Sequence, residues 1–166
     1  MASRKISIHN WYVRPGLTLI EVLVVMGMIV ILVGLGLVLS MDTFRGFTFR
    51  SERDTLVALL QQARSQAINN VCLGTACTNG RPHGVKIESN LYTMFQGPDY
   101  AAHDSGVDRQ ILPSYPLIIA AGSASEVVFQ QLSGNVDAQK EIFMTDGFGN
   151  SSTITVTNQG GISWTN

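Results

Sequence analysis

An uncharged, strongly apolar run of 18 residues constrains this chain more than any other feature of its sequence. Residues 22–39 read VLVVMGMIVILVGLGLVL, and no Asp, Glu, Lys or Arg interrupts them. As a helix, a run of this length matches the hydrocarbon thickness of a membrane, and it is too long for a typical β-strand. Three glycines lower its helix propensity in water, but in lipid only a helix satisfies every backbone group internally. We therefore expect a membrane-spanning helix.

Charges on the two sides of the run predict its orientation. Arg4, Lys5 and Arg14 precede the run and Asp42 follows it, so the positive-inside rule places the N-terminus in the cytoplasm and the rest of the chain outside. Setting aside those three cations leaves eight of the 11 Lys and Arg residues against 12 Asp and Glu. This balance gives no indication of a basic nucleic-acid-binding surface.

One carboxylate, Glu21, lies directly before the apolar run, in the sequence GLTLIEVLVV. A charged side chain costs roughly 2.5–3.5 kcal/mol at the centre of a membrane helix and less near its end, so we expect a partner that neutralises it. The alternative is a plain signal anchor in which Glu21 reaches the membrane interface. The residues after the run, MDTFRGFTFRSER, are bulky and charged, unlike the cleavage site of a secretory signal.

The residues around Glu21 resemble the class III signal of type IV pilins and type II secretion pseudopilins. The match is carried by Arg14-Pro15-Gly16 followed by Leu17-Thr18-Leu19-Ile20-Glu21, in register with the apolar run. The resemblance implies that a prepilin peptidase cuts between Gly16 and Leu17 on the cytoplasmic side and then methylates the amine of Leu17. The usual residue after the cut is phenylalanine, and this chain has leucine.

Such a cut gives Glu21 a physical role in assembly. It frees an α-amine at Leu17, and Glu21 lies four residues further along the helix, about 6 Å of rise away. A neighbouring subunit staggered by that amount places its amine against the Glu21 carboxylate. The pair relieves the membrane penalty of both groups and sets the register of assembly.

A second, weaker resemblance follows the apolar run. The segment FRSERD (residues 49–54) and the apolar positions after it are similar to the helix of the GspH/FimT group. This group comprises the H-type minor pseudopilins of type II secretion and the T/U-type minor pilins of type IV pili. The resemblance covers residues 14 to about 70, and it does not separate the two systems.

The sequence divides into four segments. We expect a leader peptide at 1–16, a transmembrane and assembly helix at 17–40, an amphipathic helix continuing into the head at 41–70, and an antiparallel β head at 71–166. Residues 17–70 contain no proline, which favours one continuous helix. Ser51-x-x-Asp54 offers the alternative of a fresh helix after a break near Gly46. The apolar face of the second half is formed by Leu56, Leu59, Leu60, Ala63 and Ala67, with Arg53 on the polar face.

After residue 70 the periodicity changes to two, which indicates strands. We expect strands at 84–88, 91–95, 117–120, 126–130, 141–145, 151–158 and 162–164, with a polar loop at 98–109. A helix followed by hairpins predicts an α+β fold with antiparallel sheets, in which a long N-terminal helix packs on a small antiparallel β-sheet head.

Two groups of side chains in the head are candidates for sites. Cys72 and Cys77 follow the helix, and a disulfide is expected because the head faces an oxidising compartment; free thiols, or a metal site with His83, are the alternatives. The second group, in GPDYAAHDSGVD, has spacing that suits calcium but also an ordinary solvated loop; its carboxylates are Asp99, Asp104 and Asp108.

No pattern indicates an enzyme or a cofactor. His103-Asp104 with Ser105 suggests a catalytic triad, but adjacency in sequence is not geometry, and neither a G-x-S-x-G elbow nor a phosphate-binding loop is present. Some minor pilins of the group bind DNA through a basic tail. Residues 158–166 contain neither Lys nor Arg, which argues against DNA; Trp164 is expected in the core.

The expected function is therefore that of a minor pilin or pseudopilin in a type II secretion pseudopilus or a type IV pilus, at its tip or in the priming complex. Its expected partners are other pilins or pseudopilins, the prepilin peptidase and the inner membrane, which the chain crosses once with its head in the periplasm. The alternatives are a tip adhesin or DNA-uptake pilin and a membrane-anchored head that never assembles.

Overall fold

The computed structural model describes residues 16–75, 77–115 and 117–166, and it does not describe the side chains of residues 37–42. The expected leader, apart from Gly16, lies outside these residues. The chain forms two compact units, Met1–Asp42 and Thr43–Asn166. The elements in chain order are α1 (Leu19–Ile68), β1 (His83–Glu88), β2 (Leu91–Gln96), the 3₁₀ turn η1 (Ser105–Val107), β3 (Arg109–Ile111), β4 (Ile118–Ile119), β5 (Glu126–Phe129), β6 (Lys140–Thr145), β7 (Ser151–Val156) and β8 (Ile162–Thr165).

Helix α1 runs for 50 residues without interruption, which confirms the continuous helix expected from the absence of proline. Ser51, the alternative start, lies inside it, and its carbonyl accepts a hydrogen bond from the Thr55 hydroxyl at 2.9 Å. The boundary between the two units falls within this helix. The head unit therefore begins with the part of α1 that follows Asp42.

A Schellman motif ends α1. Asn70 has a left-handed backbone, with φ of 54°, and its N–H donates to the Ala67 carbonyl at 3.2 Å. The N–H of Val71 then donates to the Gln66 carbonyl at 2.9 Å, which completes the motif. The returning loop passes so close that a Cβ added to Gly80 would lie 2.6 Å from the Asn70 carbonyl oxygen. Glycine is therefore required there by close packing.

The head contains two antiparallel four-stranded sheets, which agrees with the expected antiparallel β head. Their strand orders are β3-β2-β1-β5 and β4-β6-β7-β8. The chain crosses between them three times, from β3 to β4, from β4 to β5 and from β5 to β6. After β4, the Ala120 and Ala124 N–H groups donate to the carbonyls of Phe143 and Glu141 at 3.0 and 2.8 Å. Strand β3 lies just beyond the expected 98–109 loop, overlapping it at Arg109. It has three residues at a sheet edge, too few for an alternating pattern.

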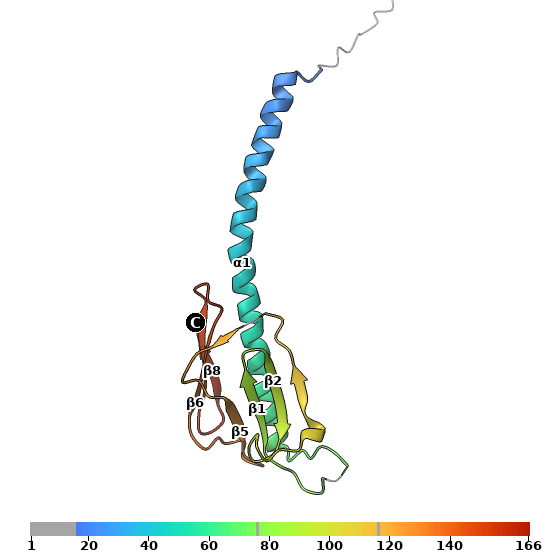
Figure 1. The fold of residues 1–166 in the computed structure, drawn as a ribbon, viewed down its shortest axis with the longest axis vertical. Helices are drawn as coiled ribbons and strands as arrows, with labels where there is room; N and C mark the ends of the chain where they lie inside the picture. The colour runs from blue at the N-terminus through green and yellow to red at the C-terminus, as the bar shows by residue number, and fades with distance from the viewer. Residues whose placement is uncertain (1–15, 76, 116) are drawn as a thin grey trace, which may run out of the picture. The chain divides into compact units, whose positions relative to one another are not determined.

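The two sheets pack on one face of α1, and strands lie alongside its C-terminal part (Figure 1). The expected apolar face is confirmed, since each of its members is at most 4% exposed: Leu56, Leu59, Leu60, Ala63 and Ala67. Sheet residues such as Val85, Phe129 and Ile154 complete the core. The fold is therefore α+β, as expected.

The expectation that Arg53 lies on the solvated face of α1 is wrong. Its side chain is buried, with a residue exposure of 6%. Its Nε and Nη2 donate to Asp54 Oδ1 at 3.0 and 2.8 Å, and its Nη1 donates to Asn166 Oδ1. The guanidinium also lies 5.4 Å from the centre of the Trp164 ring. Arg53 is buried because the C-terminal strand covers it, which helical periodicity does not reveal.

His83, the first residue of β1, is a buried neutral base. Its Nε2 lies 3.0 Å from the Val71 carbonyl oxygen, so this nitrogen carries the proton, and the buried Nδ1 has no partner among the described residues. Burial lowers the pKa of His83, and the hydrogen bond to Val71 opposes that effect only in part. The folded state therefore resists protonation of this ring.

We predict that acid destabilises the head through His83. Below its ordinary pKa of about 6.5 the unfolded chain binds a proton that folded His83 does not, so the free energy of unfolding falls as the pH falls. His83→Gln keeps a side-chain donor but does not titrate, and its stability should fall less between pH 7 and about 5. Urea unfolding of both proteins across this range measures the difference; equal pH dependence would contradict the assignment.

Candidate functional site

Thr18 caps the start of α1. Its Oγ1 accepts a hydrogen bond from the Glu21 N–H at 3.3 Å, and its carbonyl accepts from the same N–H at 3.1 Å. Thr18-x-x-Glu21 has the spacing of a capping box, in which an acidic or amide side chain three residues after the cap reaches back. The sequence shows this spacing directly, within the segment that resembles the pilin signal. Glu21 therefore lies at a well-defined helix start.

Glu21 lies on an otherwise apolar surface. It borders a shallow hollow of about 160 Å³ whose other lining residues are Leu17, Val22, Val25, Met26 and Ile29. Its carboxylate has no ion-pair partner among the described residues. The partial positive charge of the helix N-terminus favours an acidic residue in this first turn, but it does not replace a counter-ion in an apolar medium.

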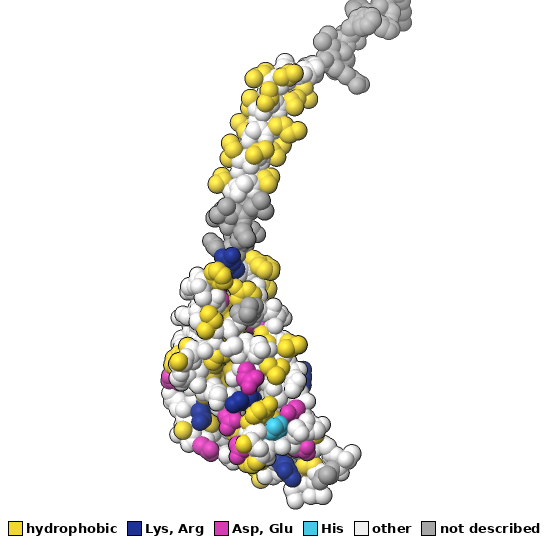
Figure 2. All heavy atoms as spheres, in the orientation of Figure 1, with side chains coloured by type: hydrophobic (Ala, Val, Ile, Leu, Met, Phe, Trp, Pro, Cys, Tyr) yellow, Lys and Arg dark blue, Asp and Glu magenta, His cyan; other side chains and the backbone are white. Residues whose placement is uncertain are grey.

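The first part of α1 is long and apolar enough to span a membrane. Leu19–Gly36 has a mean hydropathy of 2.7, and none of these 18 residues is buried. Figure 2 shows this stretch covered by hydrophobic side chains. Exposed apolar surface on this scale indicates a membrane or a protein partner, because soluble monomers rarely leave it in water.

Gly16 and Leu17, the expected processing residues, lie just before the helix. Both are exposed, Leu17 to 75%, and no heavy atom comes within 4 Å of a Cβ built on Gly16. The peptide bond between them therefore lies in non-helical chain, in which a protease can bind backbone groups. An amine created at Leu17 would be one residue from the Thr18 cap.

Cys72 and Cys77 form a disulfide, as expected, with their Cα atoms 5.7 Å apart. The bond closes the loop that follows α1. Gln96 of β2 holds the same loop, since its Oε1 accepts from the Leu73 N–H at 2.7 Å and its Nε2 donates to the Leu73 carbonyl at 3.3 Å. This end of the head is therefore cross-linked and hydrogen-bonded to the sheet.

The acidic loop does not gather its carboxylates into one site. Asp99 accepts a hydrogen bond from the Ala102 N–H at 2.7 Å, and Asp104 caps η1 through the Gly106 N–H at 3.2 Å. Asp108 pairs with His103 Nε2 at 2.9 Å, so His103 contacts Asp108 and not its sequence neighbour Asp104. Among the described residues no three His, Cys, Asp or Glu side chains are grouped to hold a metal.

The tail forms β8 and packs on α1. Trp164 is 44% exposed and lies under the Arg53 guanidinium, which differs from the core position expected for it. Arg64 Nη2 donates to the Gln159 carbonyl at 3.2 Å. Both arginines thus help to hold the tail against the helix.

No protein-family model, curated protein or solved structure matches this chain. The functional assignment therefore rests on the residues around Gly16 and Glu21 and on the geometry of α1 and the head.

We predict that the Cys72–Cys77 bond contributes about 2 kcal/mol to the stability of the head, the value expected from chain entropy for so short a loop. Urea unfolding of Thr43–Asn166, followed by Trp164 fluorescence, should show that loss on reduction. A Cys72→Ser/Cys77→Ser variant should have the same free energy of unfolding as the reduced protein, and reductant should not change that value. Thiol labelling of the oxidised, unfolded protein would contradict the bond if it gave a signal.

Proposed function

We propose that this chain is a minor pilin or pseudopilin, a structural subunit of a type II secretion pseudopilus or a type IV pilus. The observation that carries the proposal is the position of Glu21. It is a single carboxylate in the first turn of an exposed apolar helix, five residues after Gly16, and the described residues offer it no ion-pair partner. In a plain membrane anchor such a charge would only make insertion less favourable.

In this proposal Leu19–Gly36 crosses the inner membrane, with the head in the periplasm. The exposed apolar surface of the segment supports insertion, and the cations at Arg4, Lys5 and Arg14 support this orientation. Cleavage after Gly16 by a prepilin peptidase removes those cations and leaves the amine of Leu17, which the peptidase methylates.

Assembly then follows from pairing of opposite charges. The Glu21 carboxylate of one subunit pairs with the Leu17 amine of its neighbour. Pairing lowers the free-energy cost that each charged group has in lipid when it lacks a partner. The capped start of α1 supports this role, since it fixes the chain around both groups. The head then lies in the periplasm, at the tip or in the priming complex of the filament.

The tip adhesin or DNA-uptake pilin is supported less well. Its best candidates are Arg53 and Trp164, which lie together at the tail. The Arg53 side chain is buried, however, and its guanidinium already contacts Asp54, Asn166 and the Trp164 ring. These contacts are those of a side chain that holds β8 on α1.

We predict that Glu21→Gln keeps cleavage and membrane insertion but loses assembly. Glutamine still suits the third position of a capping box, so the start of the helix is retained while the charge is removed. Insertion becomes slightly easier, and the neighbour's amine is left unpaired. Crosslinking to the other filament subunits, with a pilus or secretion assay, should therefore decline while the variant accumulates in the membrane.

Thr18→Ala is the matched control for this experiment. It removes the hydroxyl that accepts the Glu21 N–H but keeps the carboxylate, so it weakens the helix start by about 1 kcal/mol without removing the charge pair. It should assemble nearly as well as the unaltered protein. Full crosslinking and activity in Glu21→Gln would show that the carboxylate has no part in assembly.

A further inference from the structure

Three phenylalanines are exposed at the end of the head unit where its part of α1 begins. Phe44, Phe47 and Phe148 are 68%, 71% and 65% exposed. The first two are three residues apart on α1 and so lie on one side of the helix. The third is in the turn between β6 and β7, and the Arg45 guanidinium lies 4.4 Å from the centre of its ring. With Arg45 and Arg50 these residues form what we call the helix-entry surface.

The β6–β7 turn holds Phe148 in this exposed position. The Asp146 carboxylate accepts hydrogen bonds from the N–H groups of Phe148 and Asn150 at 2.8 and 3.1 Å, and from the Asn150 side chain at 2.5 Å. Burial alone would raise the pKa of Asp146, but these hydrogen bonds outweigh it and lower the pKa. The turn is thus fixed by its own hydrogen bonds and presents an apolar ring to solvent.

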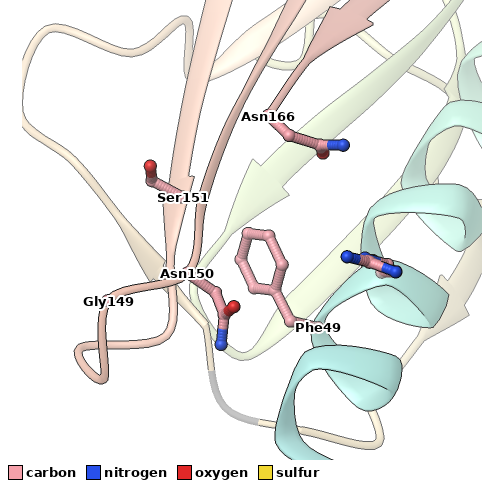
Figure 3. A pocket seen from close by; sticks show the side chains of 6 residues that line it. Phe49, Gly149, Asn150, Ser151 and Asn166 are labelled. Atoms are coloured by element: carbon pink, nitrogen blue, oxygen red, sulfur yellow. The ribbon is translucent and has the colours of Figure 1, made fainter. Parts of the chain in front are cut away.

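The surface also carries positive charge. Arg45 and Arg50 have no carboxylate partner among the described side chains. Arg50 borders a hollow of about 210 Å³ that is also lined by Asn150 and Asn166. In Figure 3, Phe49 and Asn166 extend into this space from α1 and from the end of β8. The Asn150 amide already donates to Asp146 and Asn166 Oδ1 already accepts from Arg53, so the Arg50 guanidinium is the group here that is suited to a phosphate oxygen.

The chain tethers this surface to the apolar run. Phe44 is the second residue of the head unit and follows Leu39, the end of the uncharged run, by five residues. Five residues span about 8 Å as a helix and at most about 18 Å when extended. If the apolar run lies in a membrane, this short tether therefore keeps the helix-entry surface close to the lipid headgroups. Exposed phenylalanine rings beside arginines are typical of protein surfaces that lie in the interface of an anionic membrane.

We propose that the helix-entry surface docks on anionic phospholipid headgroups at the membrane face from which the head projects. The proposal rests on membrane insertion of α1, which belongs to the proposed function. The phenylalanines enter the interface, and Arg45 and Arg50 bind lipid phosphates. Docking holds the head of an unassembled subunit against the membrane, and assembly has to release it.

The test uses the full chain in liposomes, with a nitroxide spin label at Phe148→Cys and the native cysteines kept oxidised. Leu132→Cys is the matched control, because Leu132 is 66% exposed and lies near the other end of α1, where its N–H donates a hydrogen bond to the Ala67 carbonyl. Arg45 and Ala67 are 22 residues apart in the helix, about 33 Å.

In vesicles that contain phosphatidylglycerol, the label at position 148 should be protected several-fold from a water-soluble relaxation agent and should become accessible to oxygen. Protection should be much weaker in phosphatidylcholine alone and in an Arg45→Gln/Arg50→Gln variant. The label at position 132 should remain exposed throughout.

Equal exposure of both labels in vesicles that carry the protein would overturn the docking proposal and leave the proposed function intact. Protection that rises with the ratio of protein to lipid would assign the surface to a protein partner and would also overturn it. Failure of the chain to float with the vesicles would instead contradict membrane insertion, and the proposed function with it.

Discussion

A charged carboxylate on an apolar helix costs free energy in lipid unless it has a partner, and in the proposed function this constraint organises the start of the chain. The start of α1 provides part of the stabilisation that the Glu21 carboxylate requires. Thr18 accepts the Glu21 N–H, and the helix N-terminus is a favourable place for negative charge. The carboxylate itself has no cation among the described residues. In the proposed function, an amine freed next to Thr18 on a neighbouring subunit supplies that cation.

The same helix has two kinds of surface, and the head depends on the second. Residues 19–36 are exposed, and all but Glu21 and Gly residues among them are apolar, whereas from Phe49 onward one face is covered by the two sheets. Arg53 and Glu52 are buried on this part of α1, and each reaches a different segment: Arg53 contacts Asn166, and Glu52 Oε1 accepts the Ser114 N–H at 2.8 Å. These polar contacts fix how the β3–β4 connection and the C-terminal residue lie on the helix.

Local patterns in the sequence predicted what local interactions determine. The absence of proline predicted the continuous helix, and alternation at 84–88 and 91–95 predicted the β1–β2 hairpin, whose turn begins after Glu88 and ends before Leu91. The division into two sheets depends on which strands meet across long stretches of chain, such as β5 with β1, and periodicity carries no information on this. The burial of Arg53 was missed for the same reason. Of the candidate site, Glu21 and the expected processing residues Gly16 and Leu17 came from the motif. The Thr18 cap also has a motif in the sequence, Thr18-x-x-Glu21, whereas the helix-entry surface depends on the contact between Phe148 and Arg45, which are far apart in the chain.

The mass of the chain extracted from membranes of cells that contain a prepilin peptidase tests this account most directly. Charge pairing at Glu21 requires an amine at Leu17, so the account predicts a mature chain that begins at Leu17 and carries one methyl group on that amine. A chain that keeps residues 1–16, or one that is cut after the apolar run, would contradict it, because no subunit would then offer the cation that Glu21 needs.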